Sequence, residues 1–432
     1  MAQTKPIGEG VRVLDLGMFW AGPTCTSLLA DAGMEVIKIE ACRHPDPDRI
    51  TPQGLAYVNN DPGQDPWNRG LVALRRHRNK LGCTLDLTTP EGRDLFIKLV
   101  RISDVVVENF RLGVMERWGL GYSALQRENS QIIMVSVSSS GNTGPEREYG
   151  SNAPIVACLG GLLSITGYTD EASLFVDITT PDPLAGTLAA GLVMAGLRYR
   201  KHTGKGLNIV LSQRELVTNI IGEFIMDYFM NQRIAGPSGN RHPYMAPHGC
   251  YPCKDEDSWI TLAIRNNEEW LRFCQVLGVP ELASDPRFAD GVARWHHQDD
   301  LDSIIASLSR SYPPHELMGR LQREGIAAGV VQTARDVVND PHLASRGFWE
   351  TVSHPRFGPH AFKGRGFYFS KSPVGTRSPA PCLGEHNSYV FGELLGLSPE
   401  EIARLEEKAV IGTVPSLEVR GRIPSLRSGV NP

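Results

Sequence analysis

The chain has 432 residues, of which 41% are hydrophobic and 21% charged, and its formal net charge is -4. This length and composition are ordinary for a globular protein with two or more domains. The negative charge argues against a general nucleic-acid binder, and the sequence has neither a membrane-length apolar run nor an apolar N-terminal stretch, so we expect a cytoplasmic protein that binds no membrane.

The first third of the chain alternates short runs of β-branched residues with helical patterns. Such alternation is typical of a parallel sheet wrapped by helices. No Gly-x-Gly-x-x-Gly stretch follows the first run, so a nicotinamide dinucleotide site is not indicated. The runs that predict strands cover residues 11–16, 36–40, 84–87, 105–108 and 132–137.

One helix in this part has clear start signals. Thr89 suits the N-cap, and Pro90 suits the first helical position. The apolar residues Leu95, Phe96 and Leu99 then share one face. We therefore predict an amphipathic helix that begins at residue 90.

A longer helix is predicted over residues 184–200. It would hold the carboxylate of Asp182 near its N-terminus and end over the turn Thr203-Gly204-Lys205-Gly206. A strand at residues 207–211 and a helical pattern over residues 214–230 follow it.

The remaining chain divides by composition. Residues 235–247 are rich in Gly, Pro, Asn and His, which predicts a boundary loop. Strand and helix patterns over residues 259–330 indicate a smaller α/β unit. Residues 371–384 and 412–432 are rich in Pro and Gly and are interpreted as extended arms or a tail.

Eight cysteines are scattered through a chain that is too large to need disulfides. Cys250 and Cys253 have the spacing of metal ligands, but no second pair accompanies them. We interpret them as part of a strand edge and turn, and we expect no metal site.

Several motifs follow one another along the chain in a characteristic order. They are Val13-Leu14-Asp15, Ala21-Gly22-Pro23, Asn79-Lys80, Asp104-Val105-Val106-Val107-Glu108-Asn109-Phe110, Asp182-Pro183-Leu184-Ala185-Gly186, Thr203-Gly204-Lys205-Gly206 and Leu383-Gly384-Glu385-His386. Together they resemble the class III coenzyme A transferases, also called the CaiB/BaiF family. The resemblance covers nearly the whole chain.

The resemblance implies an α/β fold with three parts. A Rossmann-like large domain would take residues 1–225, and a smaller central α/β domain would take residues 226–335. Residues 336–432 would return to the large domain and end in an extended tail. Family members form interlocked homodimers in which two chains thread through each other, and we expect the same here.

The resemblance also implies a reaction. A class III coenzyme A transferase moves coenzyme A from an acyl-CoA donor to a free carboxylic acid, so the CoA thioester is a substrate and no permanently bound cofactor is expected. Succinyl-CoA is one candidate donor, but the sequence does not name the acids.

Asp182 is the expected catalytic residue. Family members place a nucleophilic aspartate four residues before a glycine at the start of this helix, and Asp182 stands at the matching position, with Asp177 as its nearest competitor. A carboxylate can attack an acyl-CoA carbonyl, expel the thiolate and then carry coenzyme A as a thioester. The alternative is that Asp182 only caps the helix before Pro183.

Five residues fall on family positions that bind coenzyme A. Lys80 and Arg117 match positions that contact it, Asn109 and Phe110 match positions that line its groove, and Arg43 lies near a basic position of some relatives. Fixed cations are expected because coenzyme A carries phosphates. Each cation could instead be a solvated surface charge, and Asn109 and Phe110 could simply end a buried strand.

Four residues are candidates for the acyl pocket. Trp20 stands where many relatives carry Gln or Leu and would narrow the pocket if it points inward, and the run that contains Ser140 and Asn142 lacks the aromatic residue of relatives. His248 is retained because its loop can approach the active site.

The main alternative is an α-methylacyl-CoA racemase-like isomerase. The racemase branch carries a catalytic histidine where this chain has Ser151, and serine cannot replace imidazole as a base near neutral pH. The sequence therefore favours the transferase. A CoA-binding subunit of a heteromeric transferase is a further alternative, although its expected signature, loss of the aspartate, is absent here.

Overall fold

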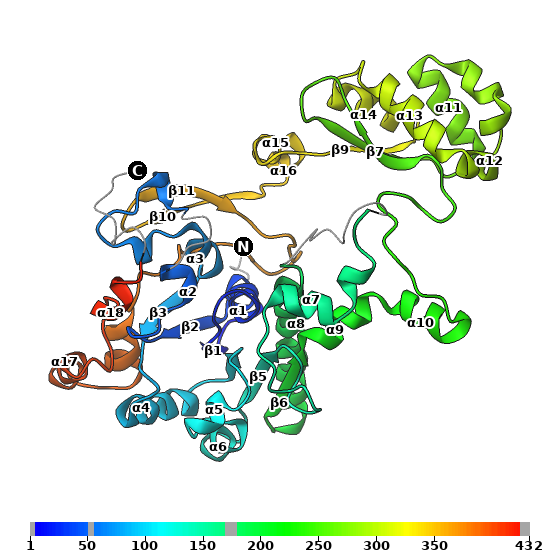
Figure 1. Ribbon diagram of the computed structural model, residues 1–432. Helices are drawn as coiled ribbons and strands as arrows, with labels where there is room; N and C mark the ends of the chain where they lie inside the picture. Colours follow the sequence, from blue (N-terminus) through cyan, green and yellow to red (C-terminus); the bar gives the residue numbers. More distant parts are fainter. Residues whose placement is uncertain (1–4, 51–55, 169–178, 424–432) are drawn as a thin grey trace. The chain divides into compact units, whose positions relative to one another are not determined.

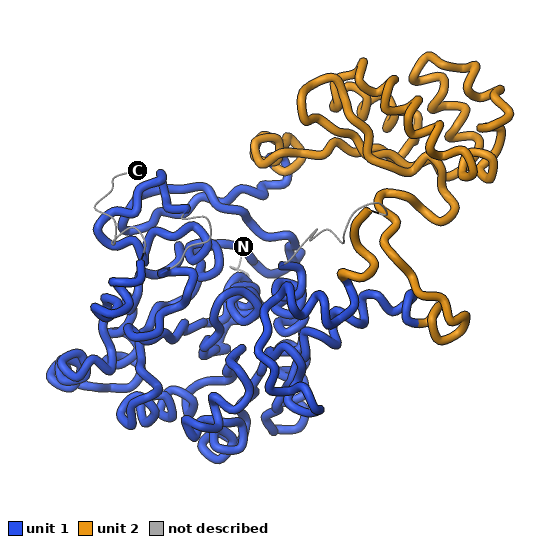
Figure 2. Tube along the Cα trace, in the orientation of Figure 1, with its two compact units in different colours: residues 1–162, 177–225, 344–432 blue, residues 163–176, 226–343 orange. Residues whose placement is uncertain are grey.

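The computed structural model describes residues 5–50, 56–168 and 179–423 of the chain (Figure 1). The chain forms two compact units (Figure 2). The larger unit, blue in Figure 2, comprises residues 1–162, 177–225 and 344–432, and the smaller unit, orange, comprises residues 163–176 and 226–343.

A six-stranded parallel sheet forms the centre of the larger unit, in the order β3-β2-β1-β4-β5-β6. This is the strand order of doubly wound nucleotide-binding sheets, in which the order reverses between β1 and β4. The predicted Rossmann-like α/β fold is therefore confirmed. The strands are β1 (Arg12–Asp15), β2 (Glu35–Glu40), β3 (Lys80–Thr84), β4 (Val105–Glu108), β5 (Ile133–Ser138) and β6 (Leu207–Ser212).

The third predicted strand, at residues 84–87, is wrong. Strand β3 lies earlier, over Lys80–Thr84, and the chain then leaves the sheet, with the Asp86 amide donating to the Val410 carbonyl. The apolar pattern failed because β3 begins with a buried charge. Lys80 is only 1% exposed, and a buried ammonium group is tolerated here because Asp15 neutralises it.

Helices cover both faces of this sheet. One face packs against α1 (Ala21–Asp31) and α8 (Pro181–Thr203) through a cluster that includes Val135, Ala189 and Val193. The buried face of α8 consists mainly of alanine and glycine, and this lets the helix lie close to the sheet and to α1. Helix α9 (Gln213–Ile220) follows β6 and packs against α8 (Figure 1).

The opposite face packs against α4 (Pro90–Arg101) and the C-terminal segment. The predicted start of α4 is confirmed, because the Thr89 hydroxyl accepts a hydrogen bond from the Gly92 amide, and Leu95, Phe96 and Leu99 are buried. Val390 and Phe391 join the same core, although they come from the far end of the sequence. The helices involved are α5 (Val114–Arg117), α6 (Tyr122–Glu128), the π-helix η7 (Ser388–Leu394) and α17 (Pro399–Glu407).

The predicted extended tail differs in part. Residues 371–384 contain no helix or strand, but α18 (Leu417–Arg420) lies within the segment expected to be extended. Ile423 is fully buried against Trp67 and Leu383, so the end of the described chain is held by apolar contacts. The other elements of the larger unit are α2 (Pro47–Ile50), α3 (Leu71–Arg76), α7 (Ala153–Leu159), β10 (Trp349–His354) and β11 (Gly358–Lys363).

The smaller unit has its own antiparallel sheet, β7-β8-β9, and its own core around Trp270, Phe273 and Phe288. Cys250 lies in β7 and Cys253 follows it, as predicted for a strand edge and turn. The elements are β7 (His248–Pro252), β8 (Trp259–Ala263), β9 (Ala327–Val330), α11 (Asn267–Leu277), α12 (Gly291–His296), α13 (Gln298–Ser309), α14 (Pro314–Arg323), α15 (Ala334–Val338) and α16 (Pro341–Ser345).

The boundaries of this unit differ from residues 226–335. It ends at residue 343, and it includes residues 163–176, which composition did not indicate. A hydrogen bond explains part of the inclusion of residues 163–176: the Gly239 amide donates to the Gly167 carbonyl, 2.9 Å away.

The helical pattern predicted over residues 214–230 forms two helices, α9 and α10 (Gly222–Asn231). Within the described residues, no helix is both long and apolar enough to span a membrane.

Candidate active site

A cavity of about 890 Å³ lies in the larger unit at the carboxyl ends of the parallel strands. Phe19 and Trp20, which follow β1, line it together with Asn109 and Phe110, which follow β4. The strand order reverses between these two strands, and ligands of open α/β sheets bind at this point. The topology therefore marks this cavity as the candidate site.

Asp182 lines this cavity from the first turn of α8. The helix begins at Pro181 and its N-cap is Thr180, so the alternative in which Asp182 itself caps the helix is not what the structure shows. The helix ends at the predicted turn, where Gly204 adopts a left-handed conformation with φ 69°. Asp177, the expected competitor, lies outside the described residues.

Gly186, four residues after Asp182, lies where α8 crosses α1. A Cβ atom at Gly186 would lie 2.5 Å from the Ala21 carbonyl oxygen and 2.6 Å from the Thr24 Cβ atom. Helices α8 and α1 thus cross with their backbones in contact, which only glycine permits at this point. The crossing fixes the first turn of α8, and Asp182 with it, beside Trp20 at the start of α1.

Gln213 is the direct hydrogen-bond partner of Asp182. Its side-chain amide donates to Oδ1 of Asp182 at 2.6 Å, and it is only 8% exposed. Burial raises the pKa of Asp182 above its ordinary value, against the opposing effects of the Gln213 hydrogen bond and the Arg76 charge. Gln213 is not among the residues predicted from the sequence, although its position directly after β6, at the same edge of the sheet, could have indicated it.

Trp20 lines the cavity, and two arginines lie close to its ring. The Cζ atoms of Arg76 and Arg75 lie 4.3 Å and 5.1 Å from the centroid of its ring. Phe19, just before it, has φ 58°, a strained value for a residue with a side chain. Arg76 holds this backbone in place, because its Nη1 donates to the Phe19 carbonyl at 2.9 Å.

Asn109 holds the other edge of this loop. Its side chain accepts a hydrogen bond from the Met18 amide at 2.7 Å and donates to the Met18 carbonyl at 2.9 Å. Phe110 lines the cavity and packs edge-on against Trp118. Both residues thus do more than end a buried strand, since each forms part of the cavity wall.

Exposed arginines line the outer part of the cavity. Arg117, on α5, is one of the predicted cations, and it is accompanied by Arg111 and Arg147, which the sequence analysis did not single out. Arg111 lies against the backbone of Gly150, where an added Cβ atom would be 2.3 Å from its Nη2. Glycine at this position therefore makes room for a guanidinium group.

The expectation that Lys80 contacts coenzyme A needs correction. The Lys80 ammonium group donates to Asp15 Oδ2 at 2.9 Å and to the Thr26 hydroxyl at 2.8 Å, and it is fully buried beneath the strand ends. It is therefore engaged in the interior and does not line the cavity. Arg43 is exposed on the turn after β2 and does not line the cavity either.

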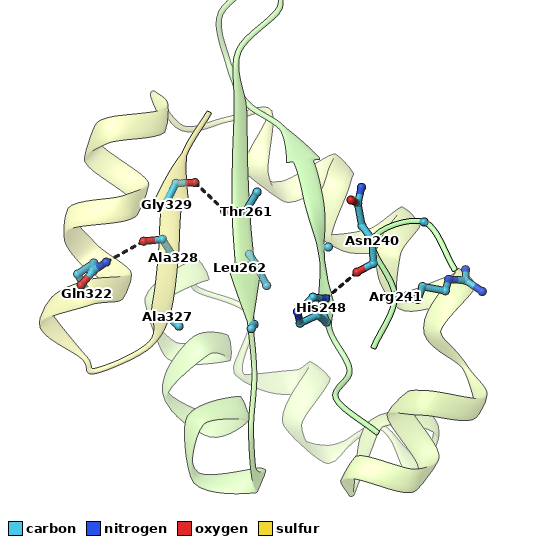
Figure 3. A pocket seen from close by; sticks show the side chains of 12 residues that line it. Asn240, Arg241, His248, Thr261, Leu262, Gln322, Ala327, Ala328 and Gly329 are labelled. Carbon is cyan, nitrogen blue, oxygen red and sulfur yellow. Dashed lines mark hydrogen bonds between the residues drawn. The ribbon is translucent and has the colours of Figure 1, made fainter. Parts of the chain in front are cut away.

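Three of the four acyl-pocket candidates lie elsewhere. Ser140 lines a separate surface pocket with Arg214, and Asn142 lines a small pocket beside Glu108. His248 belongs to the smaller unit, where it lies on β7 in a pocket of about 520 Å³ (Figure 3). Its Nδ1 lies 2.6 Å from the Asn240 carbonyl oxygen, and a dashed line in Figure 3 marks this hydrogen bond.

The cavity wall also bears on the racemase alternative. Ser151 lines the cavity at the position where a racemase would need histidine, and no histidine is among the described residues that line it. The Ser151 hydroxyl is buried and has no hydrogen-bond partner within the described part of the chain. The imidazole that a racemase uses as one of its paired bases is thus missing from the described wall.

Known proteins resemble this chain in sequence and in fold. The sequence profile of CoA-transferase family III matches residues 9–387. The chain is 37% identical over 407 residues to the succinyl-CoA–D-citramalate CoA-transferase of Chloroflexus aurantiacus, covering 94% of this chain and 98% of that protein. It is 29% identical over 397 residues to the succinate–glutarate CoA-transferase of Agrobacterium fabrum, covering 91% and 97%. Among solved structures, a CaiB/BaiF family protein from Brucella suis is similar, with a TM-score of 0.81 and 28% identity over 91% of this chain and 100% of that one.

Proposed function

This chain belongs to CoA-transferase family III, and from that premise we propose that it moves coenzyme A from succinyl-CoA to a carboxylic acid through a covalent intermediate on Asp182. The observation that carries the proposal is the position of Asp182 in the cavity at the switch point of the sheet. The choice of donor is supported by the relatives, whose names include succinyl-CoA or succinate.

The first half-reaction conserves charge and atoms at each step. An oxygen of the Asp182 carboxylate attacks the thioester carbonyl of succinyl-CoA, the C–S bond breaks, and coenzyme A leaves as a thiolate. The product on the enzyme is a mixed anhydride. The thiolate then attacks the Asp182 carbonyl carbon, succinate leaves as a carboxylate, and Asp182 carries coenzyme A as a thioester.

The second half-reaction runs the same steps in reverse with the acceptor. The acceptor carboxylate attacks the aspartyl thioester and displaces the thiolate, which then attacks the acceptor carbonyl of the new anhydride. A new acyl-CoA and the free Asp182 carboxylate result. In this scheme the Gln213 amide orients Oδ1 and stabilises the negative charge that develops on this oxygen when the thiolate adds.

Coenzyme A binding is assigned to the outer cavity. Arg111, Arg117 and Arg147 are exposed there, and guanidinium groups suit phosphate oxygens. Phe110 and the loop fixed by Asn109 form the adjoining wall. Coenzyme A enters as a substrate thioester, and the proposal needs no permanently bound cofactor and no metal.

We further propose that the protein works in the cytoplasm as an interlocked homodimer and binds no nucleic acid. Helix α10 supports the dimer, because it has no buried residue although it carries Phe229 and Met230, which are 71% and 75% exposed. Apolar residues so exposed are typical of an interface. Light scattering on the purified chain tests the dimer, and a monomer at micromolar concentration would contradict it.

An exchange assay tests the function. The purified chain should form new acyl-CoA esters when succinyl-CoA is offered with a panel of free acids, and it should do so without a second, different chain. Failure to transfer to any acid would contradict the proposal. Activity only after addition of a homologous chain would support the heteromeric alternative, and α-proton exchange without an acceptor would support the racemase.

A further inference from the structure

We propose that Arg76 binds the second carboxylate of a dicarboxylic acid acceptor, and thereby makes the site select dicarboxylic over monocarboxylic acids. The inference rests on the proposed function, because it concerns the acid that reacts at Asp182. It assigns substrate recognition to a residue that neither the motifs nor the reaction steps above identify.

The cavity contains two kinds of cation. Arg111, Arg117 and Arg147 are exposed, whereas Arg76 is only 4% exposed. A nucleotide with several phosphates extends toward solvent and can be met by exposed side chains. A short acid bound next to the nucleophile is enclosed, and a buried guanidinium attracts its carboxylate more strongly because little water screens the charges.

Arg76 is held rigidly but retains a free donor. Its Nη1 donates to both Asp48 and the Phe19 carbonyl, and the ring of Trp20 covers its guanidinium. Its Nε, by contrast, is buried and has no hydrogen-bond partner within the described residues. Buried donors are nearly always satisfied in folded proteins, so this one indicates a partner that arrives with the ligand.

The position of Arg76 relative to Asp182 fits such a ligand. Both residues line the same cavity, and the charge of Arg76 acts on Asp182 strongly enough to oppose the rise in its pKa that burial causes. A short diacid with one carboxylate at Asp182 can place the other at Arg76. A monocarboxylic acid of equal length would leave a methyl group against a buried charge, which is unfavourable.

A competition assay isolates this selectivity. Equal concentrations of glutarate and valerate, which have the same chain length, are offered with succinyl-CoA, and the ratio of glutaryl-CoA to valeryl-CoA is measured. Because both acceptors draw on the same donor, any effect of a substitution on succinyl-CoA binding cancels. The wild-type ratio should be at least about 100, as expected for a site built to pair a buried polar group.

A double variant tests Arg76 directly. Arg76→Gln combined with Asp48→Asn removes both charges of the buried pair, and the product ratio should fall by about tenfold or more, the loss of a charge-assisted hydrogen bond. The matched control is Arg75→Gln, because Arg75 stacks on the same Trp20 ring but does not line the cavity. Arg75→Gln should keep the product ratio within about twofold of the wild-type ratio, because this charge lies outside the site.

A second variant is informative even if the first does not fold. Asp48→Asn leaves Arg76 in place but removes its competing carboxylate. Burial and the neighbouring Asp46 raise the pKa of Asp48 to about 7, so the assay is run at about pH 8, where this carboxyl is mostly ionised in the wild type. The ratio should then shift further toward glutaryl-CoA.

The outcomes separate the two proposals. A ratio that stays unchanged in the active double variant, or that shifts toward valeryl-CoA in Asp48→Asn, would overturn the role of Arg76. Wild-type enzyme that uses glutarate and valerate equally would overturn it too, while leaving the transferase function intact. Absence of any transfer from succinyl-CoA would contradict the proposed function itself.

Discussion

The side-chain amide of Gln213 donates a hydrogen bond of 2.6 Å to Oδ1 of Asp182. The two residues lie in the first turns of different helices, α8 and α9, and come together because these helices pack against each other. The bond orients Oδ1, and in the proposed reaction Oδ2 is the oxygen that attacks the thioester. This pairing leads to the first prediction.

Replacing Gln213 by Leu should lower kcat by about tenfold to a hundredfold, the loss of one hydrogen bond to a reacting group. The hydrogen bond lowers the pKa of Asp182, which burial raises, so its removal should raise that pKa further. Since the reaction needs the ionised carboxylate, the acidic limb of the pH–rate profile should move to higher pH. Gln131→Leu, at an exposed position outside the cavity, is the control, and an unshifted limb in Gln213→Leu would contradict the assignment.

Gly186→Ala should destabilise the protein by about 1 to 3 kcal/mol, because the new methyl group would overlap the Ala21 carbonyl of α1. Gly191, on the same helix, is a matched control, since an added Cβ there meets no atom within 4 Å. Gly191→Ala should instead be neutral or stabilising by about 0.5 to 1 kcal/mol. Urea unfolding of both variants measures this difference, and equal effects would contradict the close crossing of α1 and α8.

Substitution of Lys80 should affect stability, whereas substitution of Arg117 should affect coenzyme A binding. Lys80→Met leaves Asp15 buried without its main partner and should cost about 3 kcal/mol of unfolding free energy, whereas Lys98→Met, at an exposed position of α4, should cost almost nothing. Arg117→Ala should leave stability unchanged and raise the KM for succinyl-CoA on the order of tenfold. A stable Lys80→Met variant with weakened CoA binding would restore the original expectation for Lys80.

Glu108 makes stability depend on pH. It is 7% exposed at the end of β4, and burial raises its pKa to about 7. The folded state therefore holds this proton more tightly than the unfolded state, so the contribution of Glu108 to stability is present in acid and is lost as pH rises toward 7. Glu108→Gln, which can still accept the Phe110 amide, should be nearly neutral at about pH 4 and stabilising by on the order of 2 to 3 kcal/mol at about pH 8. The same difference from wild type at both pH values would contradict this.

Much of the fold could be predicted because local signals and burial agree. Strand β4 lies at the predicted residues, and α4 starts at the predicted cap. The strand at β3 was misplaced because Lys80 interrupts the apolar pattern, and only its distant partner Asp15 makes that charge compatible with a buried strand. The return of residues 336–432 to the large domain is implied by the family resemblance alone, and no local signal predicts that Val390 and Phe391 pack in the core beneath the sheet.

Several residues that are predicted from motifs come together in the structure. Asp182, Trp20, Asn109, Phe110 and Arg117 all line one cavity. Gln213 and Arg76 were missed because their roles depend on which strands are neighbours and on which side chains remain buried beside the cavity. Ser140 and Asn142 are predicted from their place in a family motif and His248 from its loop, and the structure assigns them to three other pockets.

The most direct test of the account is to trap the covalent intermediate. The protein is incubated with succinyl-CoA, treated with hydroxylamine and digested, and the peptides are mapped by mass spectrometry. The account predicts a hydroxamate on Asp182 that forms only with the acyl-CoA, and no turnover in Asp182→Asn, whose amide cannot form the anhydride. A hydroxamate on another carboxylate, or an Asp182→Asn variant that still transfers coenzyme A, would contradict it.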